Sequence, residues 1–396
     1  MISNQSIICF AGEDWWYHHP HSKNHIMRRL ARAGNRVMFV NSISMGLPSA
    51  KSPDFFGKIR RKLKSYARAV RRTEEGIIVV SPPVLPFYSS PTGRAVNRAL
   101  LRAEIKSLMA AFGFRNPVLW VAIPTARDIV GHLGERALIY QVSDKYAANQ
   151  MDHATGGNVI AAMHDELLER ADLIYYSGRK LIEEETATRP EIKAKARLLE
   201  QAVDFDHFAS ATRQSWEEPA DMTDIPHPRL GYFGAIETWL LDQQLIRYVS
   251  ERRPDWQWVL MGLKAARLDI EALANVHYLG SKPYREMPRY AAGFDVCVLP
   301  WVTDNEFVSY GSAIKVREYL ATGKPVVMTP LYEYERMGDV LRIARGDDDF
   351  IAKVEDALLC DDEAQRTARQ QAVQASTWDV RAEEVSREIE RLLDSR

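Results

Sequence analysis

The sequence predicts an α/β protein built from two consecutive domains, each with a parallel sheet covered by helices on both faces. Short apolar runs typical of buried strands alternate with amphipathic helical stretches. The alternation stops at a polar, proline-containing stretch, 209–228, which reads as a linker, and then restarts. The chain has 396 residues, which is enough for two such domains.

The strands expected in the first half are short apolar runs. They are 7–11, 36–41, 76–83, 116–124, 137–144 and 171–178. The first helix is expected over 25–33, because apolar residues recur there at helical spacing and Gly34 follows as a C-cap.

The second half repeats this pattern. Its expected strands are 229–236, 257–262, 275–280, 294–301 and 325–329. We therefore expect a first domain over 1–205, a second over 206–375, and a C-terminal helix over 376–396 that packs back on the first domain. Ligands of such sheets bind at the carboxyl ends of the strands, and the cleft between two such domains is a natural site.

Composition excludes several classes of protein. The net charge is -1, which argues against a general nucleic-acid binder. Three widely spaced cysteines give neither a disulfide framework nor metal-ligand spacing, as expected of a reduced cytosolic protein. The first residues carry no basic leader, and no apolar run reaches the length of a membrane span.

One stretch, 51–72, departs from the neutral balance with nine basic residues against one acidic residue. Its apolar residues recur at helical spacing, and most of its basic residues lie off that stripe. This pattern is typical of a helix on an anionic membrane surface, although a solvated helix packed on its own domain has the same pattern. The candidate membrane residues are Phe55, Phe56, Arg60, Arg61, Lys62 and Lys64.

The stretch 313–328 places a lysine and a glutamate on a helix just before a buried strand. Lys315 and Glu318 are three residues apart, so both lie on one helix face. A Gly-Lys-Pro turn at 323–325 then leads into an apolar run. A plain surface pair has the same spacing, but the position before a buried strand favours a site.

Four stretches resemble, in their order, a known enzyme family. They are LLEQAVDFDHF (198–208), GYFGAIETWLLD (231–242), NVHYLGSKPYREMPRYAAGFDVCVLPW (275–301) and AIKVREYLATGKPVV (313–327). Together they resemble the GT-B glycosyltransferases, in particular the group-one family that builds bacterial polysaccharides. The resemblance implies two Rossmann-like domains facing across a cleft, with the sugar donor on the second.

A nucleotide-diphosphate sugar explains why the helix carries both charges. The resemblance implies that Lys315 binds the diphosphate as a point charge and that Glu318 accepts hydrogen bonds from the ribose hydroxyls. The start of the helix, near Ser312, adds backbone N–H groups for phosphate. Many retaining members carry a glutamate eight residues before Glu318. This chain has Tyr310 there, so the sequence does not assign retention or inversion.

Three further donor-site candidates follow from their places in the motifs, each with a structural alternative. Gly234 is expected in a loop, where a residue without a side chain lets the backbone approach a sugar or phosphate. Alternatively, it only forms a tight turn. Lys264 is expected either to bind a phosphate of the donor or to be an ordinary exposed lysine. Tyr284 is expected either to stack on the nucleobase of the donor or to pack at the edge of the domain.

The first domain is expected to bind the acceptor. The segment 10–25 gathers acidic, aromatic and histidine side chains after the first strand. Its acceptor-binding candidates are Trp15, Trp16 and His19, and its carboxylates are Glu13 and Asp14. Asp144 ends a strand and is the first candidate for the base that takes the acceptor proton, followed by Asp14 and Glu13. Asp144 also fits a helix N-cap. No spacing matches a zinc site, and the resemblance implies no metal and no cofactor.

The sequence therefore predicts a glycosyltransferase that moves a sugar from a nucleotide-diphosphate sugar to a saccharide acceptor. We expect the acceptor to be lipid-linked, in polysaccharide or cell-envelope glycan synthesis, and the protein to be cytoplasmic and peripheral at the inner face of the cell membrane. Two alternatives stay open: a nucleotide-sugar epimerase of similar fold, and a non-catalytic nucleotide-sugar-binding protein.

Overall fold

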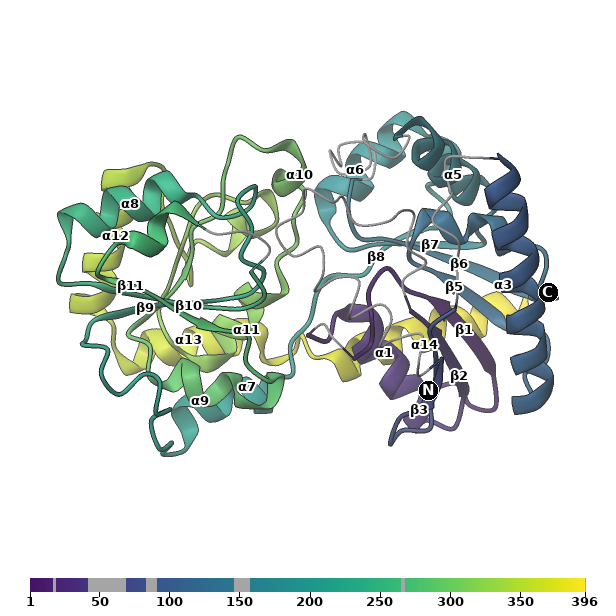
Figure 1. The fold of residues 1–396 in the computed structure, drawn as a ribbon, viewed down its shortest axis with the longest axis horizontal. Helices are drawn as coiled ribbons and strands as arrows, with labels where there is room; N and C mark the ends of the chain where they lie inside the picture. Colours follow the sequence, from purple (N-terminus) through teal and green to yellow (C-terminus); the bar gives the residue numbers. More distant parts are fainter. Residues whose placement is uncertain (17–18, 42–68, 83–90, 146–156, 265–267, 396) are drawn as a thin grey trace. The chain divides into compact units, whose positions relative to one another are not determined.

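The computed structural model describes residues 1–16, 19–41, 69–82, 91–145, 157–264 and 268–395 (Figure 1). The contacts divide the chain into two compact units. Unit 1 combines Met1–Glu200 with Asp379–Arg396, and unit 2 is Gln201–Trp378. Within the described ranges, no helix is both long and apolar enough to cross a membrane.

Unit 1 contains an eight-stranded sheet with the order β3-β4-β2-β1-β5-β6-β7-β8. Neighbouring strands are parallel except β3, which runs antiparallel to β4. The strands are β1 (Ser6–Phe10), β2 (Arg36–Val40), β3 (Val70–Arg72), β4 (Ile78–Val80), β5 (Val118–Val121), β6 (Ala137–Val142), β7 (Leu173–Tyr176) and β8 (Ala196–Leu198). The helices are α1 (Ser22–Arg32), α3 (Pro91–Phe112), η1 (Pro124–Ile129), α5 (Gly157–Arg170), α6 (Arg179–Thr188), η3 (Pro190–Ile192) and α14 (Trp378–Asp394).

The end of the basic stretch 51–72 differs from the expectation. Val70–Arg72 forms the edge strand β3, so a helix that continues to residue 72 is wrong. The alternating exposure along β3 fits an edge strand. The remaining part that the membrane hypothesis concerns, 51–68, lies outside the described residues.

Unit 2 contains a six-stranded parallel sheet with the order β11-β10-β9-β12-β13-β14. Its strands are β9 (Arg229–Phe233), β10 (Gln257–Met261), β11 (Val276–Gly280), β12 (Val296–Leu299), β13 (Val326–Met328) and β14 (Arg342–Ile343). Its helices are α7 (Phe205–Arg213), α8 (Gln243–Arg252), η4 (Asp269–Ala272), η5 (Tyr284–Glu286), α9 (Met287–Ala292), α10 (Glu306–Ser309), α11 (Ile314–Thr322), η6 (Tyr332–Met337), α12 (Asp347–Cys360) and α13 (Glu363–Gln374).

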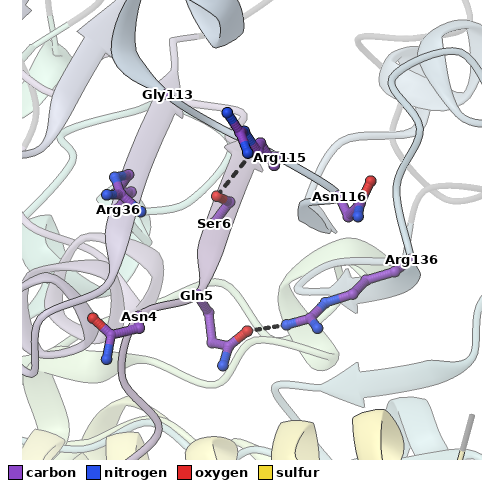
Figure 2. A pocket seen from close by; sticks show the side chains of 8 residues that line it. All are labelled: Asn4, Gln5, Ser6, Arg36, Gly113, Arg115, Asn116 and Arg136. Atoms are coloured by element: carbon purple, nitrogen blue, oxygen red, sulfur yellow. Dashed lines mark hydrogen bonds between the residues drawn. The ribbon is translucent and has the colours of Figure 1, made fainter.

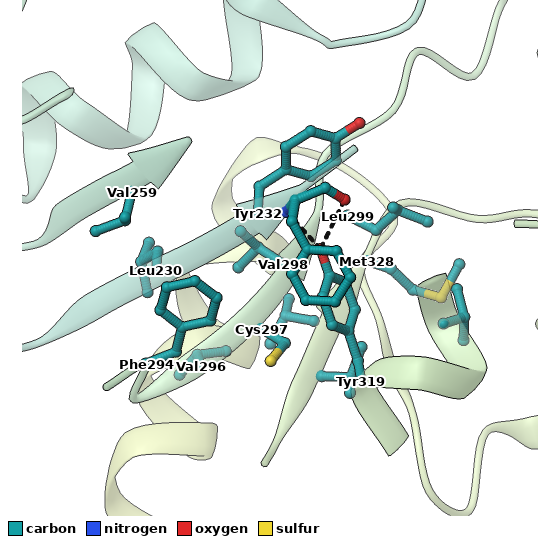
Figure 3. Close-up of a cluster of buried hydrophobic side chains, with 14 of the residues drawn as sticks. Leu230, Tyr232, Val259, Phe294, Val296, Cys297, Val298, Leu299, Tyr319 and Met328 are labelled. Carbon is teal, nitrogen blue, oxygen red and sulfur yellow. Dashed lines mark hydrogen bonds between the residues drawn. The ribbon is translucent and has the colours of Figure 1, made fainter. Parts of the chain in front are cut away.

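The core of unit 2 fixes α11 against the end of the central strand β9. Figure 3 shows Tyr319 of α11 among side chains of β9, β12 and β13. The Phe233 backbone N–H donates to the Tyr319 hydroxyl at 2.9 Å, and both residues are buried. Because a buried backbone donor needs a partner, this bond holds the helix that carries Lys315 at the carboxyl end of β9.

The stretch 209–228 is not a linker between the two units. It lies inside unit 2, where α7 extends to Arg213 and the side chains of Met222 and Ile225 are buried. Arg229, which is also buried, pairs with Glu218 of this stretch. The chain passes between the units after Glu200 and again after Trp378.

Candidate functional site

The sheet of unit 2 has a switch point between β9 and β12. From β9 the chain proceeds to β10 and β11 on one side, and β12, β13 and β14 lie on the other. Ligands of open parallel sheets bind outside the carboxyl ends of the strands at such a point. Gly234 directly follows β9 at this place, with φ +150°, a conformation that side chains rarely adopt.

Gly234 is closely surrounded by backbone and by a lysine. Its N–H donates to the Met261 carbonyl at 2.9 Å. A Cβ added at Gly262, the residue after β10, would overlap the Gly234 carbonyl oxygen. A Cβ added at Gly234 itself would lie 2.7 Å from the Lys315 Nζ. Backbone atoms of the neighbouring strand and the Lys315 side chain therefore lie close to Gly234, and no side chain fits at this position without displacing the lysine.

Lys315 lies in the first turn of α11, half-buried between two aromatic rings. Its Nζ is 4.8 Å from the Trp301 ring centroid and 5.8 Å from that of Tyr232. Burial lowers the pKa of Lys315 to about 8, although Glu318 acts in the opposite direction. No carboxylate of the described residues forms an ion pair with Lys315, so its charge is available to an anion at the switch point.

Glu318 lies in the next turn of α11, with an exposed fraction of 6%. Burial raises its pKa to about 8, and Asp204 adds to this, whereas Lys315 and a hydrogen bond with Tyr284 oppose it. The ring of Tyr284 stacks on His207 with centroids 5.0 Å apart. The structure therefore brings Glu318, Lys315 and Tyr284 together, with one face of the Tyr284 ring covered by His207.

The other two donor-site candidates already have partners. The Lys264 Nζ lies 2.6 Å from the Glu271 carboxylate and over the Tyr278 ring, so this lysine is ion-paired in the structure. Ser312 precedes α11 and hydrogen-bonds the hydroxyl of Tyr334. Ser312 is thus positioned at the start of α11 as expected from the sequence.

In unit 1, three charged side chains gather at the carboxyl edge of the sheet. Glu13 follows β1, Asp144 follows β6, and Lys23 lies in the first turn of α1. The Lys23 Nζ is 3.1 Å from a Glu13 carboxylate oxygen, and the Lys23 side chain is buried. Burial alone would lower the pKa of Lys23, but Glu13 and then Asp144 outweigh it, so the pKa is raised.

The pKa of Asp144 depends on the same neighbours. Loss of hydration by the surrounding protein raises this pKa, Lys23 opposes the increase, and Glu13 adds to it. The Asp144 side chain is exposed to solvent. Lys23 did not stand out in the sequence, because a lysine in a polar segment gives no sign that it will be buried between two carboxylates.

The aromatic candidates of unit 1 divide into a core residue and a surface residue. Trp15 is buried, with its ring edge-to-face against Phe39 and the Arg28 guanidinium 5.0 Å from its centroid. Its ring does not face solvent, so stacking on a sugar does not fit Trp15 in this structure. Trp16 is 38% exposed, and His19 is exposed.

Asp14 has a local structural role. Its carboxylate accepts hydrogen bonds from the Trp16 N–H at 2.9 Å and from the Asn41 side chain at 3.2 Å. These bonds hold the loop after β1. Among the residues that the structure describes, no group of three His, Cys, Asp or Glu side chains could hold a metal ion.

The comparisons with known proteins agree with this architecture. Residues 227–361 match the family model described as Glycosyl transferases group 1. A glycosyltransferase from Rickettsia africae superposes with a TM-score of 0.69 at 10% identity, with 100% of both chains covered. Sucrose-phosphate synthase from Thermosynechococcus elongatus gives 0.68 at 14% identity, covering 99% of this chain and 100% of that one.

HepE from Anabaena, solved in complex with UDP and glucose, gives a TM-score of 0.62 at 12% identity, over 98% of this chain and 100% of that one. No curated protein sequence matches the chain. At these identities the solved structures establish the fold, and the family model matches residues 227–361 of the second unit. The chain therefore has the two-domain GT-B fold of these structures, and its residues 227–361 match the model of the group 1 glycosyl transferases.

Proposed function

We propose that the protein transfers a sugar from a nucleotide-diphosphate sugar to a saccharide acceptor. The observation that carries the proposal is the pair on α11: Lys315, without an ion-pair partner among the described residues, at the switch point, and the buried Glu318 one turn later. The lysine suits the diphosphate, and the carboxyl group of Glu318 suits the ribose hydroxyls. HepE, a structural neighbour, was solved with UDP and with UDP-glucose, which supports this donor class.

The charge cluster of unit 1 is the proposed place of acceptor activation. An acceptor hydroxyl gives its proton to Asp144, its oxygen bonds to the anomeric carbon, and the bond from that carbon to the diphosphate breaks. The raised pKa of Asp144 makes it a stronger proton acceptor than an ordinary aspartate. Lys23 forms an ion pair with Glu13 in this cluster. Lys315 stabilises the negative charge that develops on the departing diphosphate.

The acceptor and the place of the reaction are proposed from the sequence. The basic stretch 51–72 suggests an anionic membrane surface, which is where a lipid-linked saccharide would present its sugar. We accordingly propose a peripheral enzyme of glycan synthesis that needs neither metal nor cofactor. Its candidate donor-site residues are Lys315, Glu318, Tyr284, Gly234 and Ser312.

A labelling experiment tests the function. The protein is incubated with radiolabelled nucleotide sugars and a membrane extract, and Lys315→Ala serves as the inactive control. Transfer of label to a lipid or saccharide that fails with Lys315→Ala supports the proposal. Label that stays on the nucleotide but changes sugar identity would instead show an epimerase, and retention without turnover would show a binding protein.

A further inference from the structure

A basic depression lies at the amino ends of the central strands of unit 1, at the edge of the sheet opposite Glu13 and Asp144. Its volume is about 470 Å³, within the range of small-molecule sites. Its lining residues are Asn4, Gln5, Ser6, Arg36, Gly113, Arg115, Asn116 and Arg136. This set contains three arginines and no carboxylate.

The parallel register of the sheet brings the three arginines together. Arg36 begins β2 and pairs directly with Ser6, the first residue of β1. Arg115 precedes β5, and its backbone N–H donates to the Ser6 hydroxyl at 3.2 Å. Arg136 directly precedes β6. Because β2, β1, β5 and β6 are adjacent and parallel, their amino ends lie at one level, and three of the four carry an arginine there.

The side chains surround the start of β1. Figure 2 shows Arg36 and Asn4 on one side of Gln5 and Ser6, and Asn116 and Arg136 on the other. The side chain of Arg136 donates to the Gln5 amide oxygen, which holds that guanidinium in place. The amide groups of the two asparagines add neutral donors next to the guanidinium groups.

Two of the three arginines, Arg36 and Arg115, differ from other arginines of unit 1 that form ion pairs. Arg29 pairs with Asp379, and Arg127 pairs with Glu166. Arg36 and Arg115 are exposed, and neither has an ion pair within the described part of the chain. The positive charges of Arg36 and Arg115 at the rim of one depression favour the binding of an anion there.

We propose that this depression binds the phosphate group of a phosphorylated small molecule. Guanidinium groups form paired, charge-assisted hydrogen bonds with phosphate, and three arginines line this depression. The volume exceeds that of a single phosphate, so the rest of the ligand also has room. The site is separate from the donor pair on α11, which belongs to unit 2, and the proposal does not depend on the transfer reaction.

The test uses the double substitution Arg36→Gln and Arg115→Gln in the full chain. Both side chains are exposed, so the fold should survive, and circular dichroism melting checks this. A matched control, Arg98→Gln with Arg102→Gln on the exposed surface of α3, removes the same charge from the same unit outside the depression. Lys315→Ala is present in all samples, so that binding at the donor site does not contribute.

Calorimetric titrations with inorganic pyrophosphate and with glucose 6-phosphate measure binding, and sedimentation with phosphatidylcholine vesicles containing phosphatidylglycerol forms the second arm. We expect the double variant to bind the free phosphates about tenfold more weakly or worse, and the control to bind them normally. Vesicle binding that only the double variant loses, without free-phosphate binding, would identify a lipid headgroup as the source of the phosphate. No binding in either arm, or equal losses in both variants, would overturn the site.

Discussion

Lys315 lies directly over the α-carbon of Gly234, so a Cβ added there would come within 2.7 Å of the lysine Nζ and closer still to its Cε. Through this contact, the end of the central strand β9 packs against the first turn of α11. It leaves the ammonium group between the Trp301 and Tyr232 rings. Any side chain at position 234 has to move Lys315 away from this place.

Gly234→Ala should weaken binding of UDP about tenfold, because the methyl group displaces Lys315 and the φ of +150° disfavours an alanine. Calorimetric titration measures the affinity. Gly338→Ala is the matched control, since its nearest neighbouring atom would be 3.8 Å away and its backbone is helical. Equal affinities in the two variants would show that the Gly234–Lys315 contact does not matter for the donor.

At neutral pH, Lys315→Ala should cost roughly 1.5–3 kcal/mol of nucleotide-diphosphate binding because it removes a charge-assisted contact, and Glu318→Ala should cost about 0.5–1.5 kcal/mol because it removes a neutral hydrogen bond. Both proteins should remain folded in circular dichroism. Lys353→Ala, on α12 of the same unit, is the control and should bind as the unsubstituted protein does. The assignment of the pair to the donor fails if both variants titrate like this control.

The stability of unit 2 should depend on pH through Glu318. Its pKa rises from 4.5 in the unfolded chain to about 8 in the fold, so the fold binds the extra proton between these values. The contribution is fully present below pH 4.5 and is lost as the pH rises through 8. Glu318→Gln should therefore gain stability relative to the unsubstituted protein from pH 5 to pH 8, by up to about 1.4 kcal/mol per pH unit.

Hydrogen exchange of the α11 amides at several pH values measures this difference. Glu251→Gln on α8 provides the comparison, because Glu251 is exposed and lies at the surface of the same unit. If the stability difference between Glu318→Gln and the unsubstituted protein stays constant from pH 5 to pH 8, the pKa of Glu318 is not raised in the fold.

Asp144→Asn should keep donor binding but lose transfer by on the order of a hundredfold or more, as expected for removal of a general base. Donor affinity and turnover are measured on the same preparation. Asp172→Asn makes a suitable comparison, since Asp172 caps the sheet by accepting from the Leu138 N–H and lies away from Lys23. Undiminished turnover in Asp144→Asn would transfer the proposed role to Glu13.

The protein should co-sediment with vesicles that contain anionic lipid, and high salt should release it, because each basic residue near the surface contributes about 1 kcal/mol of screened attraction. Replacement of Arg60, Arg61, Lys62 and Lys64 by Glu should abolish the binding. A protein that stays in the supernatant with such vesicles at low salt would remove the sequence-based argument for a lipid-linked acceptor.

The sequence predicted the long apolar strands well because their burial on both faces leaves a continuous apolar run. It missed β3, β8 and β14, which are short and partly exposed at or near sheet edges. It also took 209–228 for a linker, because a few buried anchors, such as Met222, do not stand out in a polar segment. Edge pairing and isolated anchors are tertiary effects that local composition does not record.

For the site, the sequence predicted that Lys315 and Glu318 lie on one face of a helix, because their spacing within a single helix determines this. The pairing of Lys23 with Glu13 was not, since it requires α1 to pack beside the end of β1. The burial of Trp15 was missed for the same reason: a tryptophan in a polar segment suits a sugar-binding surface as well as a core.

The return of the chain to unit 1 has a consequence for the order in which the protein folds during synthesis. The Arg29 side chain donates to Asp379 on α14, and the Ile2 N–H donates to Ser386, so residues near the start of the chain bond with residues translated after unit 2. Unit 2 is continuous and has all of its residues once Trp378 has left the ribosome. Unit 1, although translated first, is completed last, and it must wait without its covering helix while its neighbour forms.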